Sequence, residues 1–201
     1  MKDHPMQASE LRRHIVLAGF MGSGKSTLAR MLAGRLGTAY NDLDDVIEQR
    51  KGMPVRTIFE TLGETQFRRL ECEELAGLLA QPPHVLALGG GALAHSENRR
   101  RIGRSGLLIY IRVPPAILAK RLGGSVDRPL LLDQSGQVLP HNKLVKRIEA
   151  LLEEREPLYM QADMVFEVAS AWDPDQTLDH LQQYLHANLE PPSRTKSGRD
   201  S

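Results

Sequence analysis

The chain alternates between short runs rich in apolar residues and longer segments in which apolar residues recur every three to four positions. Short apolar runs of this kind are typical of strands that are buried on both faces of a parallel sheet. We expect strands at residues 15–17, 38–40, 84–88, 107–111 and 164–168. Because helical periodicity fills the segments between them, the pattern predicts an α/β fold, a three-layer α/β/α sandwich with a five-stranded parallel sheet.

Residues that favour helix ends bound the helical segments. We expect helices at 28–36, 46–50, 57–60, 64–79, from residue 97 onward, and at 116–122, 142–154 and 174–188. Gly37 and Gly63 are predicted to end the helices that precede them. Ser96 is predicted to cap the helix that starts at residue 97, and Asp173 to cap the last helix, with Pro174 at its first position.

The segment from Gly19 to Thr27 completes the pattern G-x-x-x-x-G-K-[ST], the signature of a phosphate-binding P-loop. Its place between a predicted strand and a predicted helix favours a P-loop over a glycine-rich turn that matches by chance. The glycines let successive N–H groups point at one anion, and the helix N-terminus favours negative charge. We expect Lys25 to reach the β- and γ-phosphates and Ser26 to offer its hydroxyl to Mg²⁺. The predicted ATP-binding residues of the loop are Gly22, Ser23, Gly24, Lys25, Ser26 and Thr27.

Carboxylates gather after the second predicted strand, at Asp42 and Asp44. In open parallel sheets, ligands bind at the carboxyl ends of the strands, which places this cluster beside the P-loop. No Asp ends the third predicted strand, where P-loop ATPases and GTPases carry a Mg²⁺-binding carboxylate. Asp42 is therefore the candidate metal ligand together with Ser26. The alternative is a polar turn in which Asp44 or Asp45 caps the helix at 46–50.

Three consecutive glycines, Gly89, Gly90 and Gly91, directly follow the third predicted strand. They remove every side chain at its carboxyl end. Two explanations are open: another group approaches the backbone closely, or the chain needs dihedral angles that only glycine adopts easily. A flexible turn is the less specific interpretation.

Four arginines, Arg68, Arg121, Arg128 and Arg155, are candidates for binding phosphate or carboxylate groups. Arg68 falls at the edge of the buried face of helix 64–79, and Arg155 falls at the end of helix 142–154. Arg121 and Arg128 flank the start of a segment, about 121–140, whose glycines and polar residues predict a mobile lid that closes on phosphate. Less specific interpretations are solvated helix arginines, an ordinary surface loop and contact with a helix dipole.

Length and charge limit the possible classes of protein. The 201 residues predict one domain, over 12–190, with flexible termini at 1–11 and 191–201. Lys and Arg number 26 against 25 Asp and Glu, so no overall basic field indicates a nucleic-acid partner.

Targeting and metal signals are also weak. The polar N-terminus lacks the apolar core of a signal peptide, and no stretch approaches the ~20 apolar residues of a membrane span. The single cysteine, Cys72, excludes an internal disulfide and fits a reducing compartment. We therefore expect a cytoplasmic protein with no membrane partner. The seven histidines lack metal-ligand spacing, so any metal is expected to be Mg²⁺ that arrives with ATP.

From about residue 14 to residue 187 the chain resembles shikimate kinase. The resemblance rests on several ordered motifs: Gly-Phe-Met-Gly-Ser-Gly-Lys-Ser-Thr at 19–27, Asp-Leu-Asp at 42–44, Ile-Phe-Glu-Thr-Leu-Gly-Glu-Thr-Gln-Phe-Arg-Arg-Leu-Glu at 58–71, Gly-Gly-Gly-Ala at 89–92, Arg-Pro-Leu-Leu at 128–131 and Arg-Glu-Pro-Leu-Tyr at 155–159. It implies a fold like that of P-loop NTPases and nucleoside monophosphate kinases. It also implies ATP-dependent phosphorylation of the 3-hydroxyl of shikimate, in the pathway to chorismate and the aromatic amino acids, by an enzyme that is usually a monomer.

The resemblance also implies roles for particular residues. Within a substrate-binding part at about 42–71 and around the glycines, shikimate would be held by Asp44, Arg68, Gly89, Gly90, Gly91 and Arg155. Arg68 and Arg155 would bind its carboxylate. Ser26 and Asp42 would serve Mg²⁺, and Arg121 would lie against the adenine. The implied catalytic residues are Lys25, Asp44 and Arg128, of which Arg128 would come from the lid to the transferring phosphoryl group.

Three other functions remain as alternatives. A gluconate kinase would share the P-loop and would have a polyol pocket with its own carboxylate contacts; the set of Arg68 and the triple glycine argues against it. A nucleotide-switch GTPase would need Asn-Lys-x-Asp, whereas Asn142 and Lys143 are followed by Leu144 and Val145. A catalytically inactive interaction protein would not need Lys25 and the other predicted catalytic residues together. Two departures from the family pattern are Leu43 inside the Asp-x-Asp motif and a longer segment at about 132–142.

Overall fold

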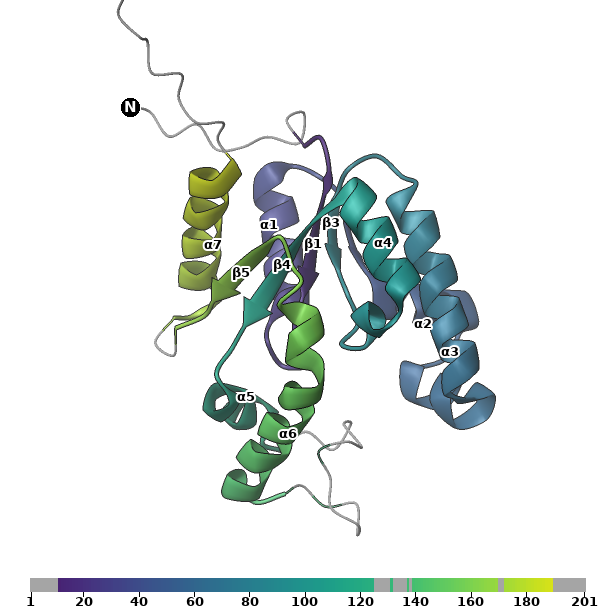
Figure 1. Cartoon of the computed structure of the whole chain (residues 1–201), viewed down its shortest axis with the longest axis vertical. Helices are drawn as coiled ribbons and strands as arrows, with labels where there is room; N and C mark the ends of the chain where they lie inside the picture. The colour runs from purple at the N-terminus through teal and green to yellow at the C-terminus, as the bar shows by residue number, and fades with distance from the viewer. Residues whose placement is uncertain (1–10, 125–130, 132–136, 138, 170–171, 190–201) are drawn as a thin grey trace, which may run out of the picture.

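The computed structural model describes residues 11–124, 131, 137, 139–169 and 172–189 (Figure 1). The predicted flexible termini apart from Leu11, most of the predicted lid and Arg128 lie outside the described residues. The division into a domain and two termini therefore stays a prediction.

A five-stranded sheet forms the centre of the fold, with all its strand pairs parallel and in the order β2-β3-β1-β4-β5. Its strands are β1 (His14–Ala18), β2 (Tyr40–Asp42), β3 (Val85–Ala87), β4 (Gly106–Arg112) and β5 (Met164–Glu167). The predicted fold class is confirmed. β1, which leads into the P-loop, lies at the centre of the sheet with β3 and β4 as its neighbours.

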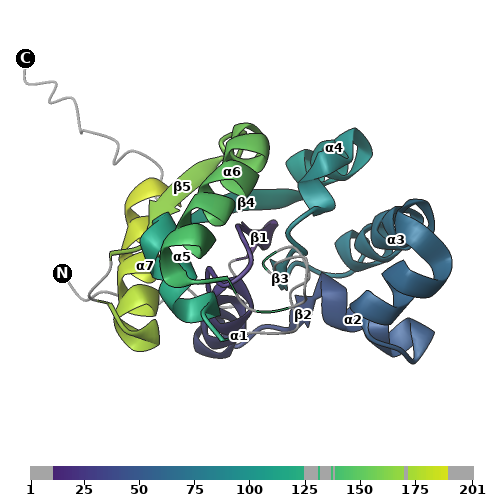
Figure 2. The same cartoon turned by 90° about the horizontal axis from the view of Figure 1, so that it is seen from below.

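Helices cover both faces of the sheet. They are α1 (Lys25–Leu36), α2 (Leu43–Lys51), α3 (Val55–Leu79), α4 (Ser96–Ser105), α5 (Pro115–Leu122), α6 (His141–Tyr159) and α7 (Pro174–Leu189), with a 3₁₀ turn, η2 (Ala92–Ala94). Figure 2 shows α1 and α7 on one side of the sheet and α3 and α4 on the other. In β1, Ile15, Val16 and Leu17 are at most 2% exposed, as expected for a strand covered on both faces.

The register of the parallel strands brings three loops together. Leu17 of β1 pairs with Ala87 of β3, and Ala87 also pairs with Asp42 of β2. Neighbouring strands lie about 4.8 Å apart, so the loops that leave this row of residues start within roughly 10 Å of one another. These loops carry the P-loop, the triple glycine and Asp44, which therefore share one edge of the sheet.

The start of α2 differs from the prediction. β2 continues to Asp42, and α2 begins at the next residue instead of at residue 46. The side chain that caps the helix is Asp42, whose Oδ1 accepts a hydrogen bond from the Asp44 N–H at 3.0 Å. Neither Asp44 nor Asp45 is the cap; both lie in the first turn, where their charge favours the helix dipole.

Two other predicted helix ends are changed. Gly63 does interrupt the helical geometry, with φ of 78° and ψ of 168°, but the helices before and after it join across this kink as α3. Ser96 is the first residue of α4 instead of its cap. The capping position is occupied by His95, which makes no side-chain cap hydrogen bond.

The end of α6 was also predicted too early. The apolar spacing predicts a helix over 142–154, and Pro157, which lacks an N–H and disfavours a helical residue before it, is consistent with an end near Arg155. The helix instead continues through Pro157 to Tyr159. The Tyr159 side chain is 2% exposed, and its burial favours the extra turn. Arg155 therefore lies one turn inside the helix.

The capping prediction for α7 is confirmed. The Asp173 carboxylate accepts a hydrogen bond from the Gln176 N–H at 2.8 Å, and the Gln176 side chain accepts one from the Asp173 N–H at 3.1 Å. This reciprocal pair satisfies two N–H groups at the start of the helix.

Of the helices in the described ranges, none is both long and apolar enough to cross a membrane.

Two buried histidines meet at the amino end of the sheet. His14 and His84 are 1% and 2% exposed, and their rings are 4.6 Å apart at 87°. His14 Nδ1 accepts a hydrogen bond from the backbone N–H of His84 at 3.3 Å, so the proton of the neutral ring is on Nε2. Nε2 donates to the Leu79 carbonyl, also at 3.3 Å. Burial, together with the neighbouring His84, lowers the pKa of His14 below its ordinary value.

The histidine pair predicts a loss of stability in acid. A base with a lowered pKa in the folded state takes up its proton more readily when unfolded, so stability falls as pH drops through the ordinary value of 6.5. Between pH 7.5 and pH 5, we expect the urea midpoint of unfolding to fall less in His14→Asn than in the wild type. The amide oxygen of the new Asn can still accept a hydrogen bond from the His84 N–H. The exposed His95, changed to Asn, is the control and should keep the wild-type pH dependence. An equal loss in all three proteins would contradict this role for His14.

Candidate active site

The P-loop has the backbone geometry expected of a phosphate-binding loop. Gly22 and Gly24 have φ of 77° and 88°, which L-residues with a side chain rarely adopt. The Ser23 N–H donates to the Phe20 carbonyl at 3.1 Å and closes the turn. α1 begins at Lys25, so its first N–H groups face the loop and form an anion-binding helix N-terminus.

The predicted phosphate-binding side chains lie at this turn. Lys25, Ser26 and Thr27 occupy the first turn of α1. The Ser23 hydroxyl oxygen is buried and has no hydrogen-bond partner within the described part of the chain. This oxygen lies against Gly19, 3.0 Å from where a Cβ on Gly19 would be.

Arg121 links α5 to the P-loop. Its Nη1 donates to the carbonyl oxygens of Gly22 and Ser23 at 3.3 and 3.2 Å. On the side facing α7, a pocket of about 370 Å³ opens between the loop and Arg121 on one side and Trp172 and Pro174 on the other. The guanidinium thus borders a space next to the phosphate loop, as the predicted position against an adenine base requires.

The triple glycine faces three predicted substrate residues, one per glycine. A Cβ at Gly89 would collide with the Asp44 carboxylate. A Cβ at Gly90 would lie 3.5 Å from Nη1 of Arg155, and one at Gly91 would lie 2.6 Å from both Nη atoms of Arg68. None of the three glycines has a positive φ. Of the two explanations left open by the sequence, close approach of another group to the backbone therefore holds at Gly89 and Gly91, whereas Gly90 has only an ordinary contact.

A buried carboxylate holds Arg68. Nη1 of Arg68 donates to Oε2 of Glu71 at 3.0 Å, and Nη2 donates to the exposed Glu64 at 3.3 Å. The Glu71 side chain is 1% exposed, and its Oε1 has no partner among the described residues. Burial raises the pKa of Glu71, and the charge of Arg68 opposes that rise. The ring centres of Phe59 and Phe67 lie 5.8 and 5.3 Å from the guanidinium carbon of Arg68.

Arg155 reaches the same glycines from α6. Its guanidinium carbon lies 5.9 Å from the centre of the Phe20 ring, at the start of the P-loop. One helical turn later, the Tyr159 hydroxyl donates to the Gly90 carbonyl at 2.7 Å. Arg68 and Arg155 thus come from two helices on opposite sides of the glycine segment. This arrangement suits a small anion, because two guanidinium groups can bind one carboxylate by charge-assisted hydrogen bonds.

The predicted metal ligands have suitable chemistry for Mg²⁺. Asp42 is 7% exposed at the end of β2, and one of its carboxylate oxygens is used by the Asp44 N–H. The other carboxylate oxygen and the Ser26 hydroxyl are hard oxygen ligands of the type that Mg²⁺ prefers. Among the described residues, no group of three or more His, Cys, Asp or Glu side chains could hold a metal by itself. These residues fit a metal that enters with the nucleotide phosphates.

Most of the predicted site is brought together, and two further residues join it. The P-loop residues, Arg121, Asp44, Arg68, Gly89–Gly91 and Arg155 share one edge of the sheet, whereas Arg128 lies outside the described residues. The sequence assigned no role to Glu71 or Tyr159. A signal existed for Glu71, which occupies a core position one turn after Phe67 on the apolar face of its helix. Tyr159 ends the Arg-Glu-Pro-Leu-Tyr motif at 155–159, but the predicted helix ends before it, so no contact with the site was expected.

Comparisons with known proteins agree with this geometry. The model of the shikimate kinase family matches residues 21–186. The shikimate kinase of Chlorobium luteolum is 43% identical over 148 residues, which are 74% of this chain and 73% of that protein. The shikimate kinase of Nitrobacter winogradskyi is 39% identical over 176 residues, 86% of this chain and 78% of that protein.

Solved structures give the same result. The shikimate kinase of Acinetobacter baumannii, solved in complex with shikimate, has a TM-score of 0.77 at 31% identity and covers 91% of this chain and 99% of its own. The shikimate kinase of Bacteroides thetaiotaomicron has a TM-score of 0.76 at 32% identity, and the match covers 87% of this chain and 98% of that one. These matches favour none of the three alternative functions. The chain belongs to the shikimate kinase family.

Proposed function

We propose that the chain transfers the γ-phosphoryl group of Mg·ATP to the 3-hydroxyl of shikimate, whose carboxylate is bound by Arg68 and Arg155. The main support for these residue roles is that Asp44, Arg155 and Arg68 lie against three consecutive glycines. A Cβ at Gly89 or Gly91 would overlap the Asp44 carboxylate or the Arg68 guanidinium, whereas one at Gly90 would only touch Arg155. A small ligand placed over these glycines would meet a carboxylate and two guanidinium groups at once.

The nucleotide is assigned to the P-loop and the pocket beside it. The N-terminus of α1 and Lys25 would bind the phosphates, and Arg121 would lie against the adenine. Ser26 and Asp42 would hold Mg²⁺, which when bound neutralises charge on the β- and γ-phosphates. Trp172 and Pro174 border the pocket on the side away from Arg121.

The acceptor is assigned to the glycine edge. Arg68 and Arg155 would fix the carboxylate of shikimate and so set the position of its ring. Asp44, seated against Gly89, would bind ring hydroxyls and orient or accept the proton of the attacking 3-hydroxyl. Phosphoryl transfer needs little covalent chemistry from the protein, so Lys25 and Arg128 would act mainly by stabilising charge on the transferring group.

The remaining partner and location proposals rest on the sequence. The balanced charge and the single cysteine fit a cytoplasmic enzyme with no nucleic-acid or membrane partner. We propose that it acts as a monomer, as members of this family usually do.

An ADP-release assay tests the substrate. With Mg·ATP, we expect release with shikimate and none above background with gluconate or without acceptor, because gluconate has a carboxylate but no ring that holds a hydroxyl in a fixed position relative to it. Omission of Mg²⁺ with excess chelator should abolish the release. Equal rates with gluconate would refute the proposed acceptor, although the P-loop assignment would survive.

Replacement of Arg68 tests the carboxylate clamp. Arg68→Lys keeps a cation beside the buried Glu71 but loses the planar fork that binds a carboxylate through two parallel hydrogen bonds. We expect the KM for shikimate to rise by about tenfold or more, the effect of losing one charge-assisted hydrogen bond, while the KM for ATP stays within about twofold. Arg69→Lys is the matched control, since Arg69 is 73% exposed and pairs with Glu73 on the outer face of the same helix. Equal changes for both substrates would indicate a structural arginine.

Gly91→Ala tests the close approach to the backbone. The Gly91 φ of −108° is open to alanine, so the new methyl group acts mainly by displacing the Arg68 guanidinium, 2.6 Å away. We expect a rise of about tenfold in the KM for shikimate, with a melting temperature within about 4 °C of wild type. Gly77→Ala, in α3 with no atom within 4 Å of its new Cβ, should leave both KM values unchanged and stabilise the protein by about 1 kcal/mol. A normal KM for shikimate in Gly91→Ala would contradict the clamp geometry.

A further inference from the structure

Tyr159 is a buried residue outside the P-loop and the charged clamp. It lies in the last turn of α6 and is 2% exposed. Its ring stacks on Tyr110 of β4, with centroids 4.9 Å apart and planes at 25°. Its hydroxyl donates to the Gly90 carbonyl at 2.7 Å, so the side chain connects α6 to the glycine segment after β3.

The Gly90 carbonyl differs from those of its two neighbours. The Gly89 carbonyl accepts a hydrogen bond from the Ala92 N–H at 3.2 Å, and the Gly91 carbonyl accepts one from the Ala94 N–H at 3.0 Å. Both of these bonds are local to the 3₁₀ turn η2. The Gly90 carbonyl instead accepts from a side chain 69 residues away. A segment without side chains cannot be held by packing of its own, so this bond anchors its middle residue.

Tyr159 also lies on the helix face that carries Arg155. Residues four apart project on the same side of a helix, so both side chains point from α6 toward the glycines. A Cβ at Gly90 would lie 3.5 Å from Arg155 Nη1 and 3.9 Å from the Tyr159 hydroxyl oxygen. Burial raises the pKa of Tyr159, and the Arg155 guanidinium opposes that rise. The hydroxyl therefore keeps its proton at neutral pH and remains a donor to Gly90.

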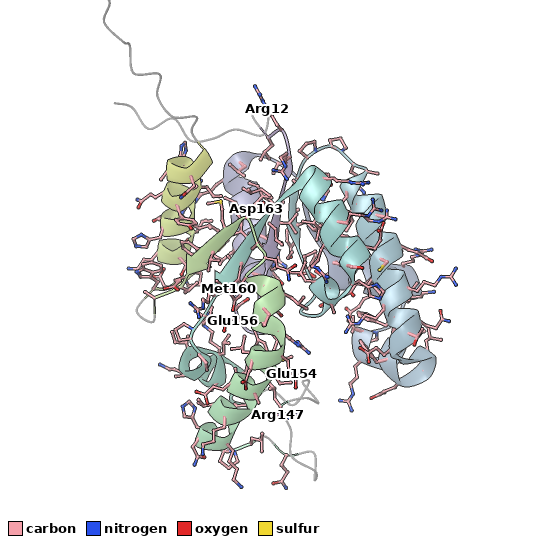
Figure 3. All side chains as sticks on the ribbon, viewed as in Figure 1. Arg12, Arg147, Glu154, Glu156, Met160 and Asp163 are labelled. Atoms are coloured by element: carbon pink, nitrogen blue, oxygen red, sulfur yellow. The ribbon has the colours of Figure 1, made fainter. Side chains whose placement is uncertain are left out.

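The end of α6 is attached to the sheet on its other side as well. Figure 3 shows the helix running from Arg147, far from the sheet, to Met160, beside the carboxyl ends of the strands. Arg112 of β4 donates to Glu156 at 2.8 Å and to Glu167 of β5 at 3.0 Å. The first bond fixes the helix to β4, and the second joins β4 to β5. Of these three contacts, only that of Tyr159 reaches the segment that follows β3.

We propose that Tyr159 is a positioning residue, which holds the Gly90 backbone and the Arg155 guanidinium in the mutual arrangement that binds the carboxylate of shikimate. This inference rests on the proposed role of Arg155 in the acceptor site. Tyr159 itself does not touch the reacting atoms. Its hydroxyl sets the distance between one half of the clamp and the surface on which the ring of the substrate would lie.

Tyr159→Phe removes the hydroxyl and keeps the ring that stacks on Tyr110. We expect the KM for shikimate to rise by about tenfold, as for one lost hydrogen bond, while the KM for ATP stays within about twofold. Tyr110→Phe is the matched control, because it removes a buried hydroxyl from the other ring of the same stack. It should leave the KM for shikimate unchanged. Parallel increases in both KM values of Tyr159→Phe, or the same increase in Tyr110→Phe, would indicate a general structural role and overturn the proposal.

A double-mutant cycle with Arg155→Lys separates this inference from the proposed function. If Tyr159 acts through Arg155, its replacement should raise the KM for shikimate much less in the Arg155→Lys background than in the wild type. Fully additive effects would overturn the proposal. A normal KM for shikimate in Arg155→Lys alone would refute the proposed role of Arg155 and this inference with it. A raised KM in Arg155→Lys beside a normal KM in Tyr159→Phe would refute only the inference about Tyr159.

Discussion

The close packing of charged side chains against Gly89–Gly91 is the constraint on which the rest of the site depends. One carboxylate and two guanidinium groups approach a backbone that offers no side chain to keep them apart. The positive charges of Arg68 and Arg155 repel each other. This repulsion is offset by Glu71, which accepts a hydrogen bond from Arg68, and by the nearby carboxylate of Asp44. The buried Glu71 is itself stable only with its partner, because an unpaired carboxylate in that position would carry the full cost of desolvation. The clamp and its counter-charges therefore form one unit.

The parallel sheet makes this unit possible. The row of Leu17, Ala87 and Asp42 lies at or one residue before the ends of three neighbouring strands, so the phosphate loop, the glycine segment and the acidic turn leave the sheet side by side. The helices that carry Arg68 and Arg155 then approach the glycines from opposite sides. A shift of β3 by one residue would move all three glycines relative to the two loops beside them. The apolar register of the strands thus fixes the geometry of a polar site.

The parts that local sequence determines could be predicted, and those that depend on tertiary contacts could not. The P-loop is specified by a short pattern between a strand and a helix, and the cap at Asp173 needs only its own four residues. The pairing of each glycine with a particular charged side chain depends on helix positions that spacing alone does not give. The last turn of α6 was missed because the helical spacing of apolar residues stops before it, and the burial of Tyr159, which favours the extra turn, is a tertiary contact. Asp42 was expected at a metal, and its additional role as a helix cap required the exact end of β2.

The charge balance of the proposed acceptor site also explains how it would select its substrate. Asp44 and Glu71 together offset the charges of Arg68 and Arg155, so these four groups sum to no net charge. Such a site attracts a distant anion weakly, and binding must come from directed hydrogen bonds at short range. The two arginines also differ, since a carboxylate holds Arg68 while a neutral phenol lies beside Arg155. Arg155 thus keeps more of its positive charge for a ligand, and its position relative to the glycines matters correspondingly more.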